Sequence, residues 1–157
     1  MRRRWVVLAV IAVAAVAAWY VVASVLNSDE AKIKRVIRGG AKALNEQNVM
    51  LFMAFISKDY RDGYGNANRE ILRQNVTAMI KLVKPGSLKV TSINVDVPEA
   101  DRATATFFAH GEIAPSVPAE VQLLSQTHAA QRLRLTFRRE QDGWRVTSAR
   151  LLESTMD

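Results

Sequence analysis

The sequence predicts a single α+β domain that follows an N-terminal transmembrane helix. Three observations predict this class. An uncharged apolar run covers residues 5–26, and hydrophobic residues then recur at helical spacing through residues 28–83. From residue 88 the hydrophobic period changes to two, which is typical of strands. We therefore divide the chain into residues 1–27, a cytoplasmic basic tip and a membrane helix, and residues 28–157, the folded domain.

The run WVVLAVIAVAAVAAWYVVASVL, residues 5–26, is long enough to cross a bilayer, whose core needs about 20 apolar residues. Three arginines precede the run and two acids follow it: Arg2, Arg3, Arg4, Asp29 and Glu30. The positive-inside rule then places the N-terminus in the cytoplasm and the domain outside. We expect a single-pass protein of the inner (cytoplasmic) membrane. A cleaved signal peptide is the alternative, with Ala23 near a cut site, but the length of the run favours an uncleaved anchor.

The composition excludes several function classes. The chain has 157 residues, a formal net charge of +7 and no cysteine, which excludes disulfides, thiol catalysis and cysteine metal sites. No basic motif interleaved with aromatic residues is present, so we expect no nucleic-acid partner. Neither His110 nor His128 has an acid or a histidine at ligand spacing, and the chain has no glycine-rich phosphate loop. We therefore expect no metal site, no cofactor and no catalytic residue.

Capping residues and apolar spacing predict three helices in the first half of the domain. Ser28 can cap a helix that extends to about Gln47, with Gly39-Gly40 as a point for a kink or a close contact. Asn48 can cap a second, shorter helix. A third helix is expected from near Asn68 to just before Pro85-Gly86, which ends it.

Alternation predicts four strands in the second half: Leu88 to Val97, Arg102 to Ile113, Gln131 to Gln141, and Trp144 to Leu152. The first two strands are joined by a turn around Pro98 to Asp101, and Pro115 to Thr127 is interpreted as a connection. Asp142-Gly143 is the strongest short-range hairpin signal in the chain. The sheet is expected to be antiparallel.

A two-residue turn at Asp142-Gly143 fixes the register of the last hairpin and places Gln141 opposite Trp144. One face of the hairpin is then apolar: Leu133, Leu135, Phe137, Trp144, Val146 and Leu152. The other face forms a basic surface: Arg132, Arg134, Arg138 and Arg145, with Thr136, Glu140 and Thr147 between them. Arg139 and Arg150 fall on the apolar face, and we expect them at its rim or paired with acids.

Three helices followed by an antiparallel sheet, with ALNEQNVMLFMAFISKDYRDGYG between the helices and EQDGWRV near the end, resemble the nuclear transport factor two-like superfamily, whose members include SnoaL-like and ketosteroid isomerase-like proteins. The resemblance covers about residues 29–152. It implies a cone-shaped domain in which a curved sheet wraps around the long helix and leaves a pocket at the open end. The superfamily contains both enzymes and binding proteins, so the fold does not decide the function.

Within this superfamily, ketosteroid isomerase uses a tyrosine and a carboxylate base in an apolar pocket. Alignment on Ala43-Leu44-Asn45 places Gly40 where the tyrosine would stand and Tyr64 where the base would stand, with Asp62 two residues away. The candidates for the pocket mouth are Asp59, Tyr60, Asp62, Tyr64, Phe108 and His110. In the competing interpretation, Asp59 and Asp62 organise the turn before the third helix and pair with Arg61 or Arg69.

These observations leave three hypotheses for function. The first is a non-enzymatic, membrane-anchored binding or assembly domain that holds an apolar ligand or a partner protein of the cell envelope, or a second copy of the chain across the sheet. The second is a tethered isomerase or dehydratase that uses Asp62. The third is binding of an anionic lipid or envelope polymer by the basic hairpin face, which would weaken as salt is raised.

Overall fold

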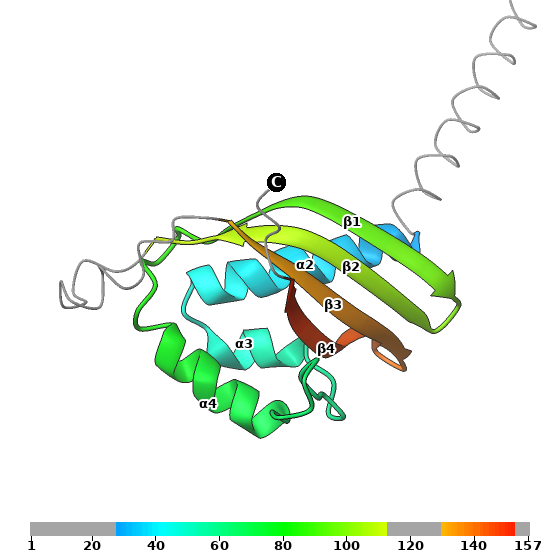
Figure 1. Ribbon diagram of the computed structural model, residues 1–157, viewed down its shortest axis with the longest axis horizontal. Coiled ribbons are helices and arrows are strands. Elements are labelled where there is room, and N and C mark those ends of the chain that lie inside the picture. The colour runs from blue at the N-terminus through cyan, green and yellow to red at the C-terminus, as the bar shows by residue number, and fades with distance from the viewer. Residues whose placement is uncertain (1–27, 113–129, 153–157) are drawn as a thin grey trace, which may run out of the picture.

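The computed structural model describes residues 28–112 and 130–152. Their elements follow one another as α2 (Asp29–Asn45), α3 (Val49–Ala54), α4 (Arg69–Met79), β1 (Lys89–Glu99), β2 (Arg102–His110), β3 (Gln131–Glu140) and β4 (Gly143–Leu152). In Figure 1 the curved sheet wraps over α2, with α3 and α4 beyond α2. The expected α+β class, with three helices and a four-stranded antiparallel sheet, is confirmed.

Residues 5–26 lie outside the described residues, so the membrane span stays a prediction. Of the helices in residues 28–112 and 130–152, none has the length and apolar character that a bilayer crossing requires.

The three helices begin at the predicted caps. Ser28 Oγ accepts a hydrogen bond from the Ala31 amide at 3.2 Å. Asn48 Oδ1 accepts from the Leu51 amide at 2.9 Å, and Asn68 Oδ1 accepts from the amides of Glu70 and Ile71 at 3.0 Å each. These side chains satisfy amide groups that have no partner inside the helix, and this is the reason why the starts could be predicted from sequence.

Helix α2 runs without a break through Gly39-Gly40. A Cβ atom on Gly39 would lie 2.7 Å from Phe55 Cζ, whereas one on Gly40 would lie 3.8 Å from the ring of Phe52. The missing side chain of Gly39 therefore allows a close contact with Phe55. A close contact was one of the two expectations for the glycine pair.

We expect Gly39→Ala and Gly40→Ala to change stability in opposite directions. The new methyl group of Gly39→Ala must displace the ring of Phe55, which should cost about 1–3 kcal/mol. Gly40→Ala places its methyl group at an ordinary contact distance and removes backbone freedom from the unfolded chain, which should stabilise the domain by about 0.5–1 kcal/mol. Urea unfolding of the two variants checks this, and a loss of stability in both would contradict it.

The sheet has the order β1-β2-β3-β4, and every neighbouring pair is antiparallel. One face packs on the helices and carries Ala103, Ala105, Phe107 and Phe137, all buried. The alternate residues of β2 and β3 lie on the other face, which we call the outer face. Thr104, Thr106 and Phe108 are outer-face residues of β2.

The predicted register of the last hairpin is wrong by two residues. Glu140 lies opposite Gly143 and Arg139 opposite Trp144, so Gln141 and Asp142 form the turn. Gly143 has a φ of +117°, a conformation that suits glycine, and it opens β4 instead of closing the turn. A shift of two keeps each residue on its face, so Trp144 and Val146 are buried as predicted.

A bulge in β4 overturns the prediction for the end of this strand. Thr136 pairs with Ser148 while Phe137 pairs with Val146, so β4 has one extra residue at Thr147. An extra residue reverses the faces beyond it. Leu152 therefore pairs with Arg132, and Arg150 pairs with Arg134, on the outer face, while Leu151 faces the helices opposite Leu133. The expectation that Leu152 and Arg150 lie on the apolar face is wrong.

Candidate functional site

The space between the sheet and the helices is packed with apolar side chains. Phe137 and Ile33 are 0% exposed. They belong to one cluster, whose other members are Ile37, Met53, Ile56, Tyr60, Ala103, Ala105, Phe107, Trp144 and Val146. Among the described residues, the polar or charged side chains that are buried belong to Ser57 and Ser87. The described interior therefore holds no buried carboxylate.

The segment of residues 55–68, which we call the 55–68 loop, is hydrogen bonded along β4. The Ser57 amide donates to the Val146 carbonyl at 2.9 Å, the Arg61 amide to Thr147 at 3.0 Å, and the Gly63 amide to Ala149 at 2.8 Å. The loop thus covers the edge of β4, so this edge does not present its backbone groups to another chain.

The structure separates the candidates that the sequence grouped at a pocket mouth. Tyr60 is only 3% exposed and belongs to the core cluster. Its burial raises the pKa of the phenol, and the nearby charge of Asp62 adds to this. Phe108 and His110 lie on the outer face, because they alternate with the buried Phe107. These two residues therefore lie apart from the 55–68 loop, and the structure does not group them with Asp59, Tyr60, Asp62 and Tyr64 at one pocket mouth.

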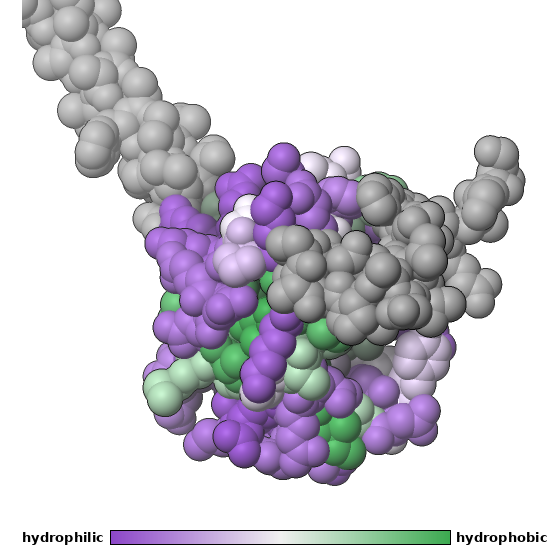
Figure 2. Space-filling model, turned by 90° about the vertical axis from the view of Figure 1, so that its left-hand side faces the viewer, coloured by the Kyte–Doolittle hydropathy of each residue, from purple (hydrophilic) through white to green (hydrophobic). Residues whose placement is uncertain are grey.

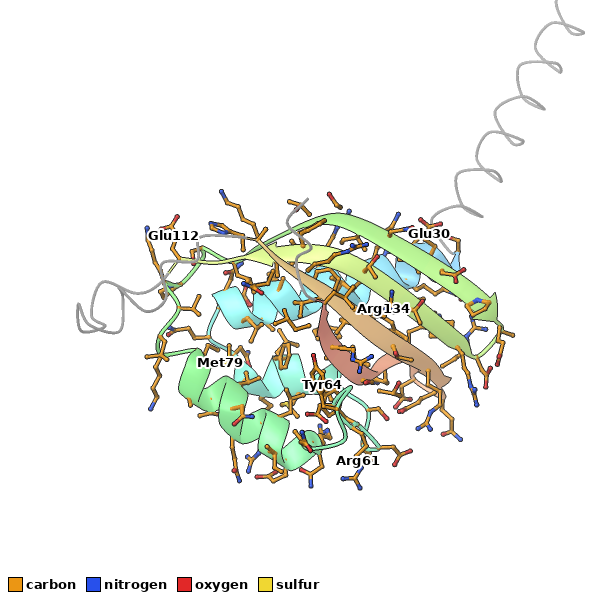
Figure 3. All side chains as sticks on the ribbon, in the orientation of Figure 1. Glu30, Arg61, Tyr64, Met79, Glu112 and Arg134 are labelled. Atoms are coloured by element: carbon orange, nitrogen blue, oxygen red, sulfur yellow. The ribbon has the colours of Figure 1, made fainter. Side chains whose placement is uncertain are left out.

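The remaining candidates are engaged within the loop or with the strands. Asp62 Oδ1 accepts from the Asn66 amide at 2.6 Å. The hydroxyl of Tyr64 donates to the Leu151 carbonyl at 3.2 Å, and the guanidinium of Arg150 lies 5.1 Å from the centroid of the Tyr64 ring. Figure 3 shows Tyr64 beside β4. The contact of Asp62 agrees with its interpretation as a residue that organises the turn before α4.

A polar network that includes Ser57 and Glu140 escaped the sequence reasoning. The hydroxyl of Ser57, a residue 1% exposed, donates to Glu140 Oε1 at 2.6 Å and accepts from the Asp59 amide at 3.2 Å. Arg138 Nη2 donates to Asp59 Oδ2 at 2.6 Å and lies 3.4 Å from Glu140 Oε1. Asp59 thus pairs with Arg138 and not with Arg61 or Arg69. The only sequence signal was the alternation that places Arg138 and Glu140 on one strand face.

The start of α2 is attached to the last hairpin by a contact that we call the Asp29 clamp: Asp29, Arg139 and Trp144. Trp144 Nε1 donates to Asp29 Oδ1 at 3.2 Å, and Arg139 donates to the same oxygen. The guanidinium of Arg139 also lies 5.0 Å from the centroid of the Trp144 ring. Arg139 is therefore paired with an acid at the rim of the apolar face, as expected.

Burial by itself raises the pKa of Asp29, but the hydrogen bonds from Trp144 and Arg139 and the charges of Arg139 and Lys32 outweigh it. The pKa of Asp29 therefore lies below its ordinary value of 3.8. A depressed pKa in the folded state adds stability above the ordinary value, and this stability is lost as the pH falls through the folded value.

We expect Asp29→Asn to be less stable than the native chain at pH 7 by about 0.5–1 kcal/mol, because the amide keeps an acceptor oxygen but loses the charge. The difference should shrink as the pH falls below the ordinary pKa of 3.8. Urea unfolding at several pH values between 2.5 and 7 tests this, with those pH limits chosen as roughly one unit or more on either side of the carboxyl range. A difference that is independent of pH would contradict the clamp.

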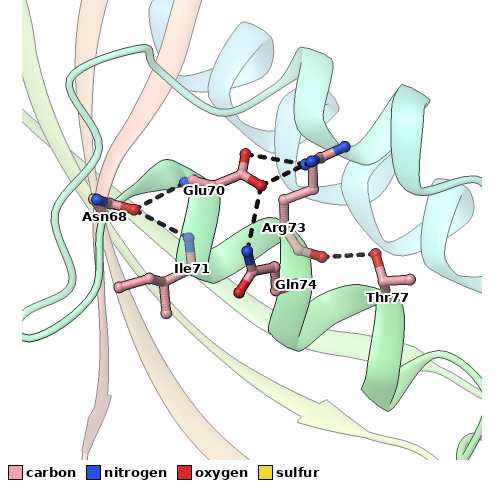
Figure 4. A network of polar contacts seen from close by, with 6 residues as sticks. All are labelled: Asn68, Glu70, Ile71, Arg73, Gln74 and Thr77. Carbon is pink, nitrogen blue, oxygen red and sulfur yellow. Dashed lines mark hydrogen bonds and ion pairs between the residues drawn. The ribbon is translucent and has the colours of Figure 1, made fainter.

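The start of α4 carries a surface network of polar side chains (Figure 4). Arg73 donates to both carboxylate oxygens of Glu70, at 3.1 and 2.7 Å, and the hydroxyl of Thr77 donates to the Arg73 carbonyl at 2.7 Å. The hydrogen bond from Arg73 lowers the pKa of Glu70. These side chains are exposed, and such pairs add little stability. The network therefore supports the helix, and Arg73 and Thr77 also line an open hollow on its surface together with Gln74, Ala78 and Lys81.

Helix α4 buries none of its residues fully. Large apolar side chains are exposed at the start of α3 and around the end of α4: Met50, Leu51, Met79 and Leu82. In Figure 2, which faces the end of the domain where α4 finishes, hydrophobic surface lies between hydrophilic side chains. Figure 3 places Met79 at this end.

The predicted basic surface divides into two pairs of arginines. Arg138 is bound to Asp59 and Glu140, and Arg145 donates to the Ala54 carbonyl. Arg132 and Arg134 are exposed and, within residues 28–112 and 130–152, make no ion pair. Figure 3 shows Arg134 on β3. No group of three or more acidic or histidine side chains in the same ranges is placed to hold a metal ion, and His128 lies outside them.

Comparison with known proteins gives structural neighbours only. No family model matches the chain, and no curated protein does. A solved protein from Novosphingobium aromaticivorans, named as a candidate aromatic ring hydroxylase, is 16% identical with a TM-score of 0.60, over 78% of this chain and 87% of the other. An NTF2-like protein of unknown function from Pseudomonas putida is 14% identical with a TM-score of 0.59, over 78% and 84%.

A third neighbour, from Shewanella frigidimarina, is named as a candidate ketosteroid isomerase. It is 15% identical with a TM-score of 0.55, over 81% of this chain and 97% of the other. The domain therefore has the nuclear transport factor two-like fold, as the resemblance implied. At these identities the neighbours define the fold and leave the function open.

Proposed function

We propose that the protein is a non-enzymatic binding domain, held by residues 5–26 on the extracytoplasmic side of the inner membrane. The observation that carries the proposal is that Asp62, the candidate catalytic acid, is hydrogen bonded within its own loop. The carboxylate of Asp62 accepts from the Asn66 amide, and the interior beside the loop is apolar. A general base needs a carboxylate that faces a substrate in a pocket. The domain acts through its surface.

The packed interior also disfavours an apolar ligand held in the cone, because such a ligand needs a preformed cavity of a few hundred Å³. Phe137, Ile33 and Phe107 occupy the corresponding space. The partner is therefore another component of the cell envelope that docks on the outside of the domain.

The Asp29 clamp supports a role for the tether. Residues 1–27 join the domain at Ser28, and Asp29 is held by Arg139 and Trp144 of the sheet. The start of α2, where residues 1–27 join the domain, is thus fixed relative to the last hairpin. This arrangement suits a domain that presents one surface to a partner.

The tether is tested with the full chain in membranes. We expect the chain to stay in the membrane fraction after alkaline carbonate washing, and protease added on the extracytoplasmic side to digest the domain. Release of a shortened chain by the wash, or digestion only after the cytoplasmic side is opened, would overturn the proposed location.

Asp62 separates the binding domain from the alternative enzyme, an isomerase or dehydratase. Asp62→Ala should lower the free energy of unfolding by about 1 kcal/mol, because the Asn66 amide loses its acceptor. Asp62→Asn keeps an acceptor oxygen and should remain within about 0.5 kcal/mol of the native chain. Isomerase and dehydratase assays on the native chain and on Asp62→Asn complete the test. An activity of the native chain that Asp62→Asn abolishes would favour the enzyme.

A further inference from the structure

The outer face of the sheet carries a group of three exposed arginines, which we call the arginine triad: Arg132, Arg134 and Arg150. Arg134 and Arg150 lie directly opposite each other on β3 and β4, and Arg132 lies two residues from Arg134 on the same face. Like charges at directly opposed positions destabilise a sheet. The fold therefore keeps an arrangement that is unfavourable in the isolated domain.

A second pair of opposed arginines on the same face shows how such repulsion is relieved. Arg138 lies opposite Arg145, but Arg138 is bound to Asp59 and Glu140, and Arg145 donates to the Ala54 carbonyl. In the part of the chain that the structure describes, the triad has no acidic partner: Arg150 stacks on Tyr64, and Arg132 and Arg134 make no ion pair. The charge of the triad is thus available to an external anion.

Among the described residues, the strand neighbours of the triad add hydrogen-bonding groups and no negative charge. Arg132 lies beside Phe108 and Leu152, and Arg134 lies beside Thr106. The hydroxyl residues Thr136 and Ser148 form the next opposed pair. Arginine guanidinium groups bind phosphate and carboxylate oxygens in paired hydrogen bonds, and hydroxyl groups can add further ones.

The position of the triad relative to the tether decides which anion it meets. Asp29, the first residue of α2 and the second after the tether, contacts Arg139 next to the turn of the last hairpin. Arg132 lies seven residues before Arg139 on β3, which corresponds to about 23 Å along the strand. The triad therefore lies at the end of the sheet remote from the point where residues 1–27 join the domain. This distance from the entry of the proposed anchor favours an anion other than the headgroups of the bilayer that the anchor would cross.

We propose that the arginine triad binds a linear polyanion of the extracytoplasmic space, one that carries phosphate or carboxylate groups along its length. Alternate residues of a strand are about 7 Å apart, so Arg132 and Arg134 can engage successive anionic groups of one polymer chain while Arg150 flanks them. This inference rests on the proposed function and names the partner class and the surface. Exposed charge of one sign also attracts such a polymer before contact.

The test uses the full chain in neutral detergent micelles, with inorganic polyphosphate and polygalacturonate as probes. We expect both polymers to bind, with an affinity that falls as salt is raised, because the Debye length shrinks from about 30 Å at 0.01 M to about 10 Å at 0.1 M. The double variant Arg132→Gln and Arg134→Gln should bind about tenfold more weakly at low salt, since two exposed ionic contacts are lost.

The control is the double variant Arg38→Gln and Arg61→Gln, which changes the charge by the same amount. Arg38 lies on α2 and Arg61 in the 55–68 loop, and both are exposed. This control should bind within about twofold of the native chain. Figure 3 shows that Arg61 lies away from Arg134. Thermal unfolding of both double variants confirms that they are folded, because the four side chains are exposed.

Equal losses in the two double variants would overturn the proposal, since binding would then follow net charge. Binding to anionic phospholipid vesicles without binding to either polymer would assign the surface to the membrane instead. A native chain that dimerises through the triad and binds neither polymer would assign the surface to a second copy. None of these outcomes affects the carbonate and protease tests, so a failure of this inference is distinguishable from a failure of the proposed function.

Discussion

Replacement of Phe137 by alanine is expected to lower the free energy of unfolding by about 3–5 kcal/mol, because the ring is fully buried in the core. Phe137 is 0% exposed and sits on β3 opposite Ala103 on one side and Val146 on the other. Its two cross-strand neighbours are small or medium in size, so they cannot fill the space that the ring leaves. The loss therefore includes the transfer of the ring and the cost of a cavity.

Phe108→Ala provides the matched control, because it removes the same side chain from the outer face of the neighbouring strand. Phe108 is half-buried and lies between Thr91 and Arg132. We expect a loss of about 1 kcal/mol or less, since the described helices pack on the other face of the sheet. Chemical denaturation of both variants gives the comparison. Similar losses in the two would mean that the outer face is covered in the native protein.

Replacement of Trp144 by alanine is expected to cost nearly as much, about 3–4 kcal/mol. Trp144 is 4% exposed, its Nε1 donates to Asp29, and its ring lies under the guanidinium of Arg139. The change removes a buried ring and at the same time disconnects the start of α2 from the sheet. Hydrogen exchange should then show faster exchange of the first turns of α2 than of its last turns.

Trp144→Phe separates the two contributions. Phenylalanine keeps most of the apolar contact but has no N–H group for Asp29, so we expect a loss of about 1 kcal/mol. In a double-mutant cycle with Asp29→Asn the losses should not add, because both changes affect one contact. If the two losses added within about 0.3 kcal/mol, the Asp29 clamp would have no energetic role.

The candidate site shows where sequence reasoning succeeds and fails. It grouped Asp59, Tyr60, Asp62 and Tyr64 at a pocket mouth and offered a turn-organising role for Asp62 as the competing interpretation, with which the contact to the Asn66 amide agrees. It could not find the network of Ser57, Arg138 and Glu140, because Ser57 and Glu140 are 83 residues apart in sequence. Only the course of the loop along β4 brings them together.

Phe108 shows a different limit, in which the sequence did not decide which face of the sheet a residue occupies. Alternation correctly put Phe107 and Phe108 on different faces, but the choice of the inner face requires knowledge of where the helices pack. Both residues are phenylalanine, so the residue type gave no preference for which of them faces the helices. The structure places Phe107 in the core, and with it Ala103 and Ala105, so Phe108 and His110 face outward.

By itself the sequence determined the features that arise from short-range chemistry: the caps at Ser28, Asn48 and Asn68, the presence of four strands, and the burial of Trp144 and Val146. It placed the end of the first strand at Val97 and that of the second at Ile113, whereas β1 extends to Glu99 and β2 ends at His110. Tertiary structure alone decided the filling of the cone, the bulge at Thr147 and the position of Arg150 beside Arg134. The physical reason is that caps and periodicity depend on neighbours within a few residues, whereas faces and packing depend on which distant strands and helices meet.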